Sequence, residues 1–133
     1  MAKIYRLFIS HSWDHVDDLK NLKGLLEQQE SFDVEFYEMA PENAINSDNS
    51  TYIKRCISAR IGEADIVLGI AGIYASYSEW MQWELDKAKE KGKKIIGVVP
   101  WGQERISSIV AARADVVVRW NTKSIIEAIK KLM

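Results

Sequence analysis

The chain has 133 residues, 47% of them hydrophobic and 28% charged, which is typical of one globular domain with its own core. Its 18 basic and 19 acidic side chains leave a formal net charge of -1, so a general nucleic-acid binder with a basic excess is excluded. The single cysteine, Cys56, rules out an internal disulfide. No apolar run approaches the length of a membrane span, and the N-terminus lacks a signal-peptide core. We therefore expect one cytoplasmic domain over residues 1–133, with no nucleic-acid or membrane partner.

Apolar residues change repeatedly from strand-like to helix-like spacing along the chain. Five short β-rich runs predict strands, in chain order Ile4–Ser10, Val34–Glu38, Asp65–Ala71, Lys94–Val99 and Asp115–Arg119. Five segments with apolar residues three or four apart predict helices, in chain order Asp14–Gln29, Thr51–Ile61, Ser76–Lys91, Glu104–Ala112 and Thr122–Leu132. The run 65–71 is almost wholly apolar, which indicates a central strand, whereas 34–38 alternates as an edge strand does. The polar stretch Met39–Ser50 is the longest predicted loop.

Strict alternation of strands and helices predicts an α/β fold with a parallel sheet between two helical layers. We expect a flavodoxin-like three-layer sandwich with five strands in the order 2-1-3-4-5. Ligands of such sheets bind beyond the carboxyl ends of the strands, where the strand order reverses. In this order that point lies between the first and third strands. Segments 10–14 and 72–84 should therefore meet there.

Tryptophans gather near this edge of the predicted sheet. Trp13, Trp101 and Trp120 each follow a strand, and Trp80 and Trp83 lie in the helix after the third strand. Flat aromatic rings suit the ring of a nucleotide or of nicotinamide. Each tryptophan taken singly is better explained as packing that seals the end of the sheet. The cluster as a whole favours a ligand site.

Glu84 is the candidate for chemistry. It follows Trp80 by four residues, so the two side chains should share one face of a helix. A carboxylate beside an aromatic wall is partly desolvated, and it can stabilise a developing positive charge or act as a nucleophile or base. On spacing alone, a solvated carboxylate paired with Lys87 or Lys91 is the better explanation.

Other catalytic patterns are weak or missing. His11 and His15 are four residues apart beside aspartates, but capping of the next helix explains the aspartates, and we expect no metal site. Ser10 and Ser12 flank His11 without a third group that would complete a hydrolase triad. The chain also lacks both glycine-rich phosphate-binding patterns, G-x-G-x-x-G and G-x-x-x-x-G-K-[ST].

Several segments resemble a known family. Phe8–Trp13 resembles the opening of TIR-like domains, and Tyr74–Glu84 resembles the segment with their W-x-x-x-E pattern. Gly97–Glu104, together with Trp120–Thr122, is similar to the bacterial and archaeal TIR-like family that includes ThsB of the Thoeris anti-phage system. The resemblance spans nearly the whole chain, and the motifs are specific for the family only in combination.

This resemblance implies a TIR-like domain that consumes NAD as a substrate and needs no cofactor. Glu84 matches the glutamate that catalytic TIR domains need to cleave the nicotinamide–ribose bond. The product would be a cyclic ADP-ribose-type signal, which diffuses to an effector with a sirtuin-like NADase domain. Met39–Ser50 would correspond to the BB loop that often mediates self-association, although it lacks that loop's compact glycine- or proline-rich form. The substrate-binding residues would be Ser10, His11, Ser12, Trp13, Tyr77 and Trp80.

Two other functions remain open. The chain could be a non-catalytic TIR interaction module, although such adaptors tend to lack the helix glutamate found here as Glu84. It could also be another N-glycosidic enzyme, similar to nucleoside deoxyribosyltransferases, which share the architecture and also use a helix glutamate. The tryptophan-rich edge and the stretch Trp101–Glu104 favour a TIR-like domain over the deoxyribosyltransferase-like enzyme.

Overall fold

The computed structural model describes residues 4–11, 16–30, 32–37, 50–72, 79–100, 102 and 106–133. The strands within these residues are β1 (Ile4–Ser10), β2 (Asp33–Phe36), β3 (Ile66–Ile70), β4 (Ile95–Val99) and β5 (Val116–Arg119). The helices are α1 (Val16–Glu27), α3 (Ser50–Glu63), α4 (Glu79–Glu90), α5 (Ser108–Arg113) and α6 (Thr122–Leu132).

The strands form one parallel sheet in the order β2-β1-β3-β4-β5, which confirms the predicted α/β, flavodoxin-like fold. β3 lies at the centre and is buried at every position. β2 is an edge strand in which exposed and half-buried residues alternate, as its sequence pattern predicts. It ends at Phe36 rather than at Glu38.

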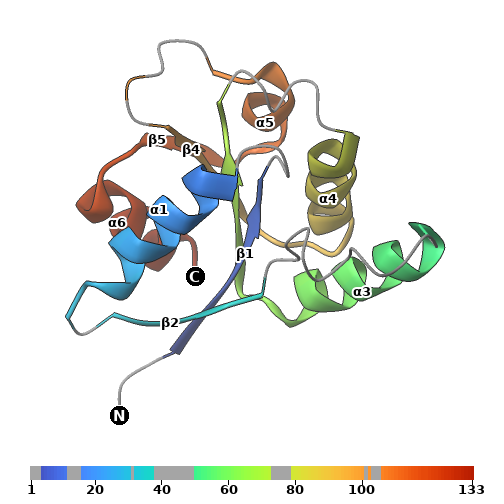
Figure 1. The fold of residues 1–133 in the computed structure, drawn as a ribbon, viewed down its shortest axis with the longest axis horizontal. Helices are drawn as coiled ribbons and strands as arrows, with labels where there is room; N and C mark the ends of the chain where they lie inside the picture. Colours follow the sequence, from blue (N-terminus) through green and yellow to red (C-terminus); the bar gives the residue numbers. More distant parts are fainter. Residues whose placement is uncertain are drawn as a thin grey trace.

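Successive residues of each strand face opposite helical layers, because side chains in a strand alternate between the two faces of the sheet. Leu7 and Ile66 pack with residues of α1 and α6, whereas Phe8 and Val67 pack with residues of α3, α4 and α5. Figure 1 shows α1 and α6 on one side of the sheet and α3 and α4 on the other, which completes the predicted three layers. The half-buried Cys56 of α3 packs at the second of these cores.

Two aspartates bond the amino ends of neighbouring strands in the same way. Asp65, just before β3, donates its amide to the carbonyl of Arg6 and accepts the amide of Arg6 on its carboxylate. Asp115, just before β5, makes the same pair of bonds to Ile95. Each aspartate thereby satisfies an amide that the parallel ladder leaves open, and this sets where the strands begin.

The short helix α5 lies close to the sheet because two glycines leave room for it. Gly69 of β3 and Gly97 of β4 are paired in the sheet, and a Cβ on either one would lie 3.2 or 3.3 Å from a methyl carbon of Val110. The predicted start of α5 at Glu104 is wrong, since the helix begins at Ser108 and is capped by the side chain of Ser107.

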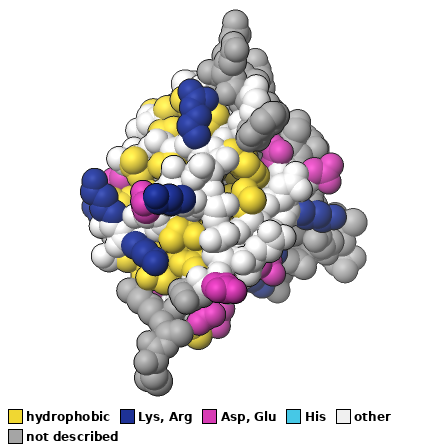
Figure 2. All heavy atoms as spheres, turned by 90° about the vertical axis from the view of Figure 1, so that its left-hand side faces the viewer, with side chains coloured by type: hydrophobic (Ala, Val, Ile, Leu, Met, Phe, Trp, Pro, Cys, Tyr) yellow, Lys and Arg dark blue, Asp and Glu magenta, His cyan; other side chains and the backbone are white. Residues whose placement is uncertain are grey.

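Charged side chains of both signs are spread over the face of the molecule seen in Figure 2. Figure 2 shows the face that Figure 1 has on its left, where Lys and Arg side chains are interspersed with acidic ones and with separate apolar areas. Among the described residues, no helix combines the length and the apolar composition needed to cross a bilayer. Of the predicted loop Met39–Ser50, the structure describes Ser50 alone, which is the first residue of α3. Asp17 and Asp18 lie in the first turn of α1, whereas Asp14 lies outside the described residues.

The glycine at position 97 provides a test of this packing. We expect Gly97→Val to lower the free energy of unfolding by roughly 1–3 kcal/mol, because its side chain overlaps Val110 and Val117. Gly24→Ala is the matched control in α1, where an added Cβ meets nothing within 4 Å, and it should raise stability by roughly 0.5–1 kcal/mol. Denaturant unfolding measures both changes. Equal stabilities of the Gly97→Val variant and the parent chain would contradict the close approach of α5.

Candidate active site

Glu84 lies in the apolar stripe of α4. The buried residues of this helix are Met81, Glu84, Leu85 and Ala88, a spacing that places all four on the side facing the sheet. The Glu84 side chain is only 2% exposed. The prediction of a solvated Glu84 paired with a lysine, which spacing alone favoured, is therefore wrong. Nζ of Lys87 instead lies 3.0 Å from Oε2 of Glu90.

The carboxyl of Glu84 bonds to the carboxyl end of β1. Ser10 is the last residue of β1, it is fully buried, and its hydroxyl donates to Oε1 of Glu84 over 2.7 Å. Ser10 faces α4 because it lies two residues after Phe8, whose side chain enters the core on that face. Its partner in the sheet is Gly69 of β3, so the bond lies where the sheet order reverses.

Burial changes the protonation of this carboxyl. Loss of water around Glu84 raises its pKa, the hydrogen bond from Ser10 lowers it by a smaller amount, and the net result is a rise from 4.5 to about 8. At neutral pH the side chain is therefore mostly a neutral carboxylic acid. A pKa raised in this way is typical of catalytic acids and bases in clefts.

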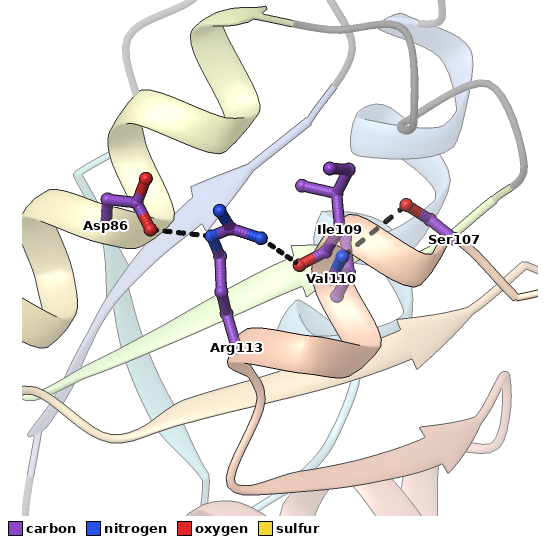
Figure 3. Close-up of polar contacts among 5 residues, drawn as sticks. All are labelled: Asp86, Ser107, Ile109, Val110 and Arg113. Atoms are coloured by element: carbon purple, nitrogen blue, oxygen red, sulfur yellow. Dashed lines mark hydrogen bonds and ion pairs between the residues drawn. The ribbon is translucent and has the colours of Figure 1, made fainter.

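Two cationic side chains on the neighbouring helices, Arg113 and Lys54, have partners other than Glu84. Arg113 of α5 bonds to Asp86 of α4 over 2.6 Å and to the carbonyl of Ile109 over 3.0 Å (Figure 3). Lys54 of α3 lies over the rings of Trp80 and Trp83, with its Nζ 6.0 and 5.6 Å from their centroids. These contacts fix α3 and α5 against α4, and none of them brings a cation to Glu84.

His11 follows Ser10 at the end of β1 and is 2% exposed. Its Nδ1 lies 3.2 Å from the carbonyl oxygen of Ile9, so a proton on that nitrogen would be donated to the backbone. The described part of the chain holds no group of three or more His, Cys, Asp or Glu side chains suited to a metal.

Trp80 and Glu84 contact different neighbours despite their spacing. The half-buried Trp80 ring meets Trp83 edge-on at 6.4 Å and lies under Lys54 of α3, whereas Glu84 meets Ser10 of β1. Sequence reasoning did not single out Lys54, since an exposed lysine in a helix gives no signal of its aromatic partners. Trp120 is half-buried against the core of α1 and α6.

The structure thus describes four of the predicted site residues: Ser10 ends β1, His11 follows it, and Trp80 and Glu84 lie on α4. The predicted contacts of Ser12, Trp13 and Tyr77 lie outside the described residues, as does Trp101. A buried carboxyl at the carboxyl end of β1 is suited to reactions that develop positive charge on a sugar, such as N-glycosidic cleavage.

Solved structures resemble this chain in their fold. BcmB, a CMP N-glycosidase of Clostridium botulinum, matches with a TM-score of 0.60 and 18% identity over 95% of this chain and 98% of its own. A prokaryotic SEFIR domain matches with a TM-score of 0.49 and 17% identity over 96% of this chain and 95% of its own. No curated protein matches the sequence.

A family model covers most of the chain. The model of the Thoeris protein ThsB, TIR-like domain, matches residues 8–105. The matched segment includes Ser10 and Glu84, and it accounts for well over half of the chain. The chain therefore belongs to the family of TIR-like domains of the Thoeris protein ThsB.

Proposed function

We propose that this protein consumes NAD by cleaving the bond between nicotinamide and ribose. The observation that carries this proposal is the buried Glu84 carboxyl, held by the Ser10 hydroxyl at the carboxyl end of β1. Membership of the ThsB family and the parallel sheet order support it. NAD is the substrate in this scheme, and no cofactor takes part.

The chemistry follows from the charges of the reactants. Nicotinamide in NAD carries a positive charge and leaves as a neutral base, taking the electron pair of the broken C–N bond. The ribose then develops oxocarbenium character, which a nearby carboxylate stabilises. Ser10 holds Oε1 of Glu84, so Oε2 is the oxygen available to face the sugar. The ionised form of Glu84 is the active one in this step.

The second step decides the product. Water attacking the ribose carbon gives linear ADP-ribose, whereas a hydroxyl of the adenosine ribose gives a cyclic isomer. A buried reaction centre favours the internal nucleophile because water is excluded. We therefore propose a cyclic ADP-ribose-type signal in anti-phage defence, acting on a sirtuin-like NADase effector. Self-association of the TIR-like domain and contacts of substrate with His11, Ser12, Trp13, Tyr77 and Trp80 belong to the same proposal.

Three alternative functions make different predictions. A non-catalytic interaction module would leave NAD intact and would have no use for a carboxyl buried at a loss of stability. An N-glycosidase acting on a nucleotide with an uncharged base, as BcmB is described for CMP, would use protonated Glu84 to assist the leaving base. Deoxynucleosides would be exchanged by a deoxyribosyltransferase-like enzyme. Incubation with NAD, CMP and deoxynucleosides, followed by chromatography, separates these functions.

Removing the carboxylate tests the catalytic role. Glu84→Gln should lower the rate of NAD cleavage by about a hundredfold or more, because the amide has no charge to stabilise the ribose cation. Glu90→Gln on the same helix is the control, since Glu90 is exposed and pairs only with Lys87, and its rate should stay within about twofold of the parent. Chromatography of the products gives both rates. Equal rates of the parent and Glu84→Gln would exclude Glu84 from the reaction.

Removing the hydroxyl tests the positioning role of Ser10. The Ser10 hydrogen bond lowers the pKa of Glu84, so Ser10→Ala should raise that pKa further. We expect about tenfold slower NAD cleavage at pH 7 and a pH–rate profile displaced upward by about one unit. A loss of rate with an unmoved profile would show that Ser10 contributes only packing.

The raised pKa of Glu84 also predicts how stability depends on pH. The folded chain keeps the proton up to about pH 8, whereas the unfolded chain loses it near pH 4.5. The folded state binds more protons between these values, so the free energy of unfolding should fall as pH rises through this window. Glu84→Gln should be more stable than the parent by on the order of 3 kcal/mol at pH 7, with little difference near pH 4.5. Urea unfolding across pH 4.5–8 measures the difference, and a pH-independent gap would contradict the raised pKa.

A further inference from the structure

The Glu84 carboxyl lacks a positive partner among the described residues. Its oxygen Oε1 accepts one hydrogen bond, from the neutral hydroxyl of Ser10, and the side chain is almost completely buried. Carboxylates buried in proteins are otherwise paired with a cation or bound by several donors. Within the described part of the chain, Glu84 is therefore an acidic group without a balancing positive charge.

The groups packed around Glu84 explain this imbalance. β1 contributes the hydroxyl of Ser10 and then the buried His11, whose Nδ1 lies against the Ile9 carbonyl. α3 faces α4 with the apolar Ile53, Ile57 and Ile61. The charged groups on the neighbouring turns and helices have partners of their own. Arg113 pairs with Asp86, Lys87 pairs with Glu90, and Lys54 lies over the rings of Trp80 and Trp83.

We propose that the cationic nicotinamide ring supplies the missing charge and that its binding expels the proton from Glu84. This inference rests on the proposed function. The proton leaves the carboxyl for the bulk buffer, and no bond of the substrate changes in this step. The substrate thereby generates the carboxylate that the following cleavage needs. An empty site keeps Glu84 neutral, so the buried carboxyl becomes charged only when its partner is bound.

A positive charge beside Glu84 lowers its pKa by enough to ionise it at neutral pH. An opposite charge within about 4–6 Å lowers the pKa of a carboxyl by about 1–3 units. Starting from about 8, a decrease at the upper end of this range, about 3 units, brings Glu84 from mostly protonated to almost fully ionised at neutral pH. By reciprocity, the ionised carboxyl must favour a cationic ring over a neutral one.

This reciprocity makes oxidised and reduced dinucleotide a matched pair of probes. NADH has the same phosphates, riboses and adenine as NAD, but its dihydronicotinamide ring is neutral. The site should therefore discriminate between them by ring charge alone. The discrimination should weaken by about 50-fold from pH 8 to pH 6, because the ionised fraction of Glu84 in the empty site falls from about one half to about one hundredth.

The test is calorimetric titration with an uncleavable carbocyclic analogue of NAD and with its reduced form, in two buffers of different ionisation enthalpy. At pH 7 we expect about 0.9 proton released per bound oxidised analogue, since about nine tenths of Glu84 is protonated beforehand. The reduced analogue should release none. Between pH 6 and pH 8 the affinity for the oxidised analogue should rise about 50-fold.

Two variants identify the source of the proton. Glu84→Gln should release none with either analogue, and Glu90→Gln should behave as the parent does. Binding of the oxidised analogue without proton release, or equal release from Glu84→Gln, would overturn this inference. If NAD were still cleaved with the Glu84 dependence described above, the proposed function would stand without it. If neither analogue bound at any pH and NAD stayed intact, the proposed function would fail and the inference with it.

Discussion

The hydrogen bond from Ser10 to Glu84 is the interaction on which the functional interpretation depends. It joins the last residue of β1 to the middle of α4 across 74 positions of sequence, in a place closed to water. A carboxyl with one neutral donor in such a place keeps its proton to about pH 8. The same bond leaves the second oxygen of Glu84 for a ligand. The position of the Glu84 carboxyl and its raised pKa thus have the same cause, which is burial of the side chain at the edge of the sheet.

Burying the Glu84 carboxyl lowers the stability of the folded chain. A leucine or methionine at position 84 would complete the apolar stripe that Met81, Leu85 and Ala88 form on α4. The chain instead has an ionisable group there, which lowers the stability of the fold as the pH rises toward 8. Residues that violate the local pattern of a core in this way are expected at functional sites.

The surrounding fold holds the site rigidly. Asp65 and Asp115 fix the starts of β3 and β5, and the paired glycines Gly69 and Gly97 let α5 lie close to the sheet. Arg113 then ties α5 to Asp86, two residues beyond Glu84. The position and direction of α4 are therefore set by its contacts with β1, α3 and α5.

The sequence by itself determined the layers, the strand order and the edge of the sheet where a ligand should bind, because apolar periodicity and strict strand–helix alternation depend on local spacing. It also pointed to Glu84, although spacing alone favoured a solvated side chain. Only the tertiary structure decided that Glu84 is buried against Ser10, that Trp80 packs toward Lys54, and that α5 begins at Ser108. Burial and hydrogen bonding join residues far apart in the chain, and no pattern of neighbouring residues encodes them.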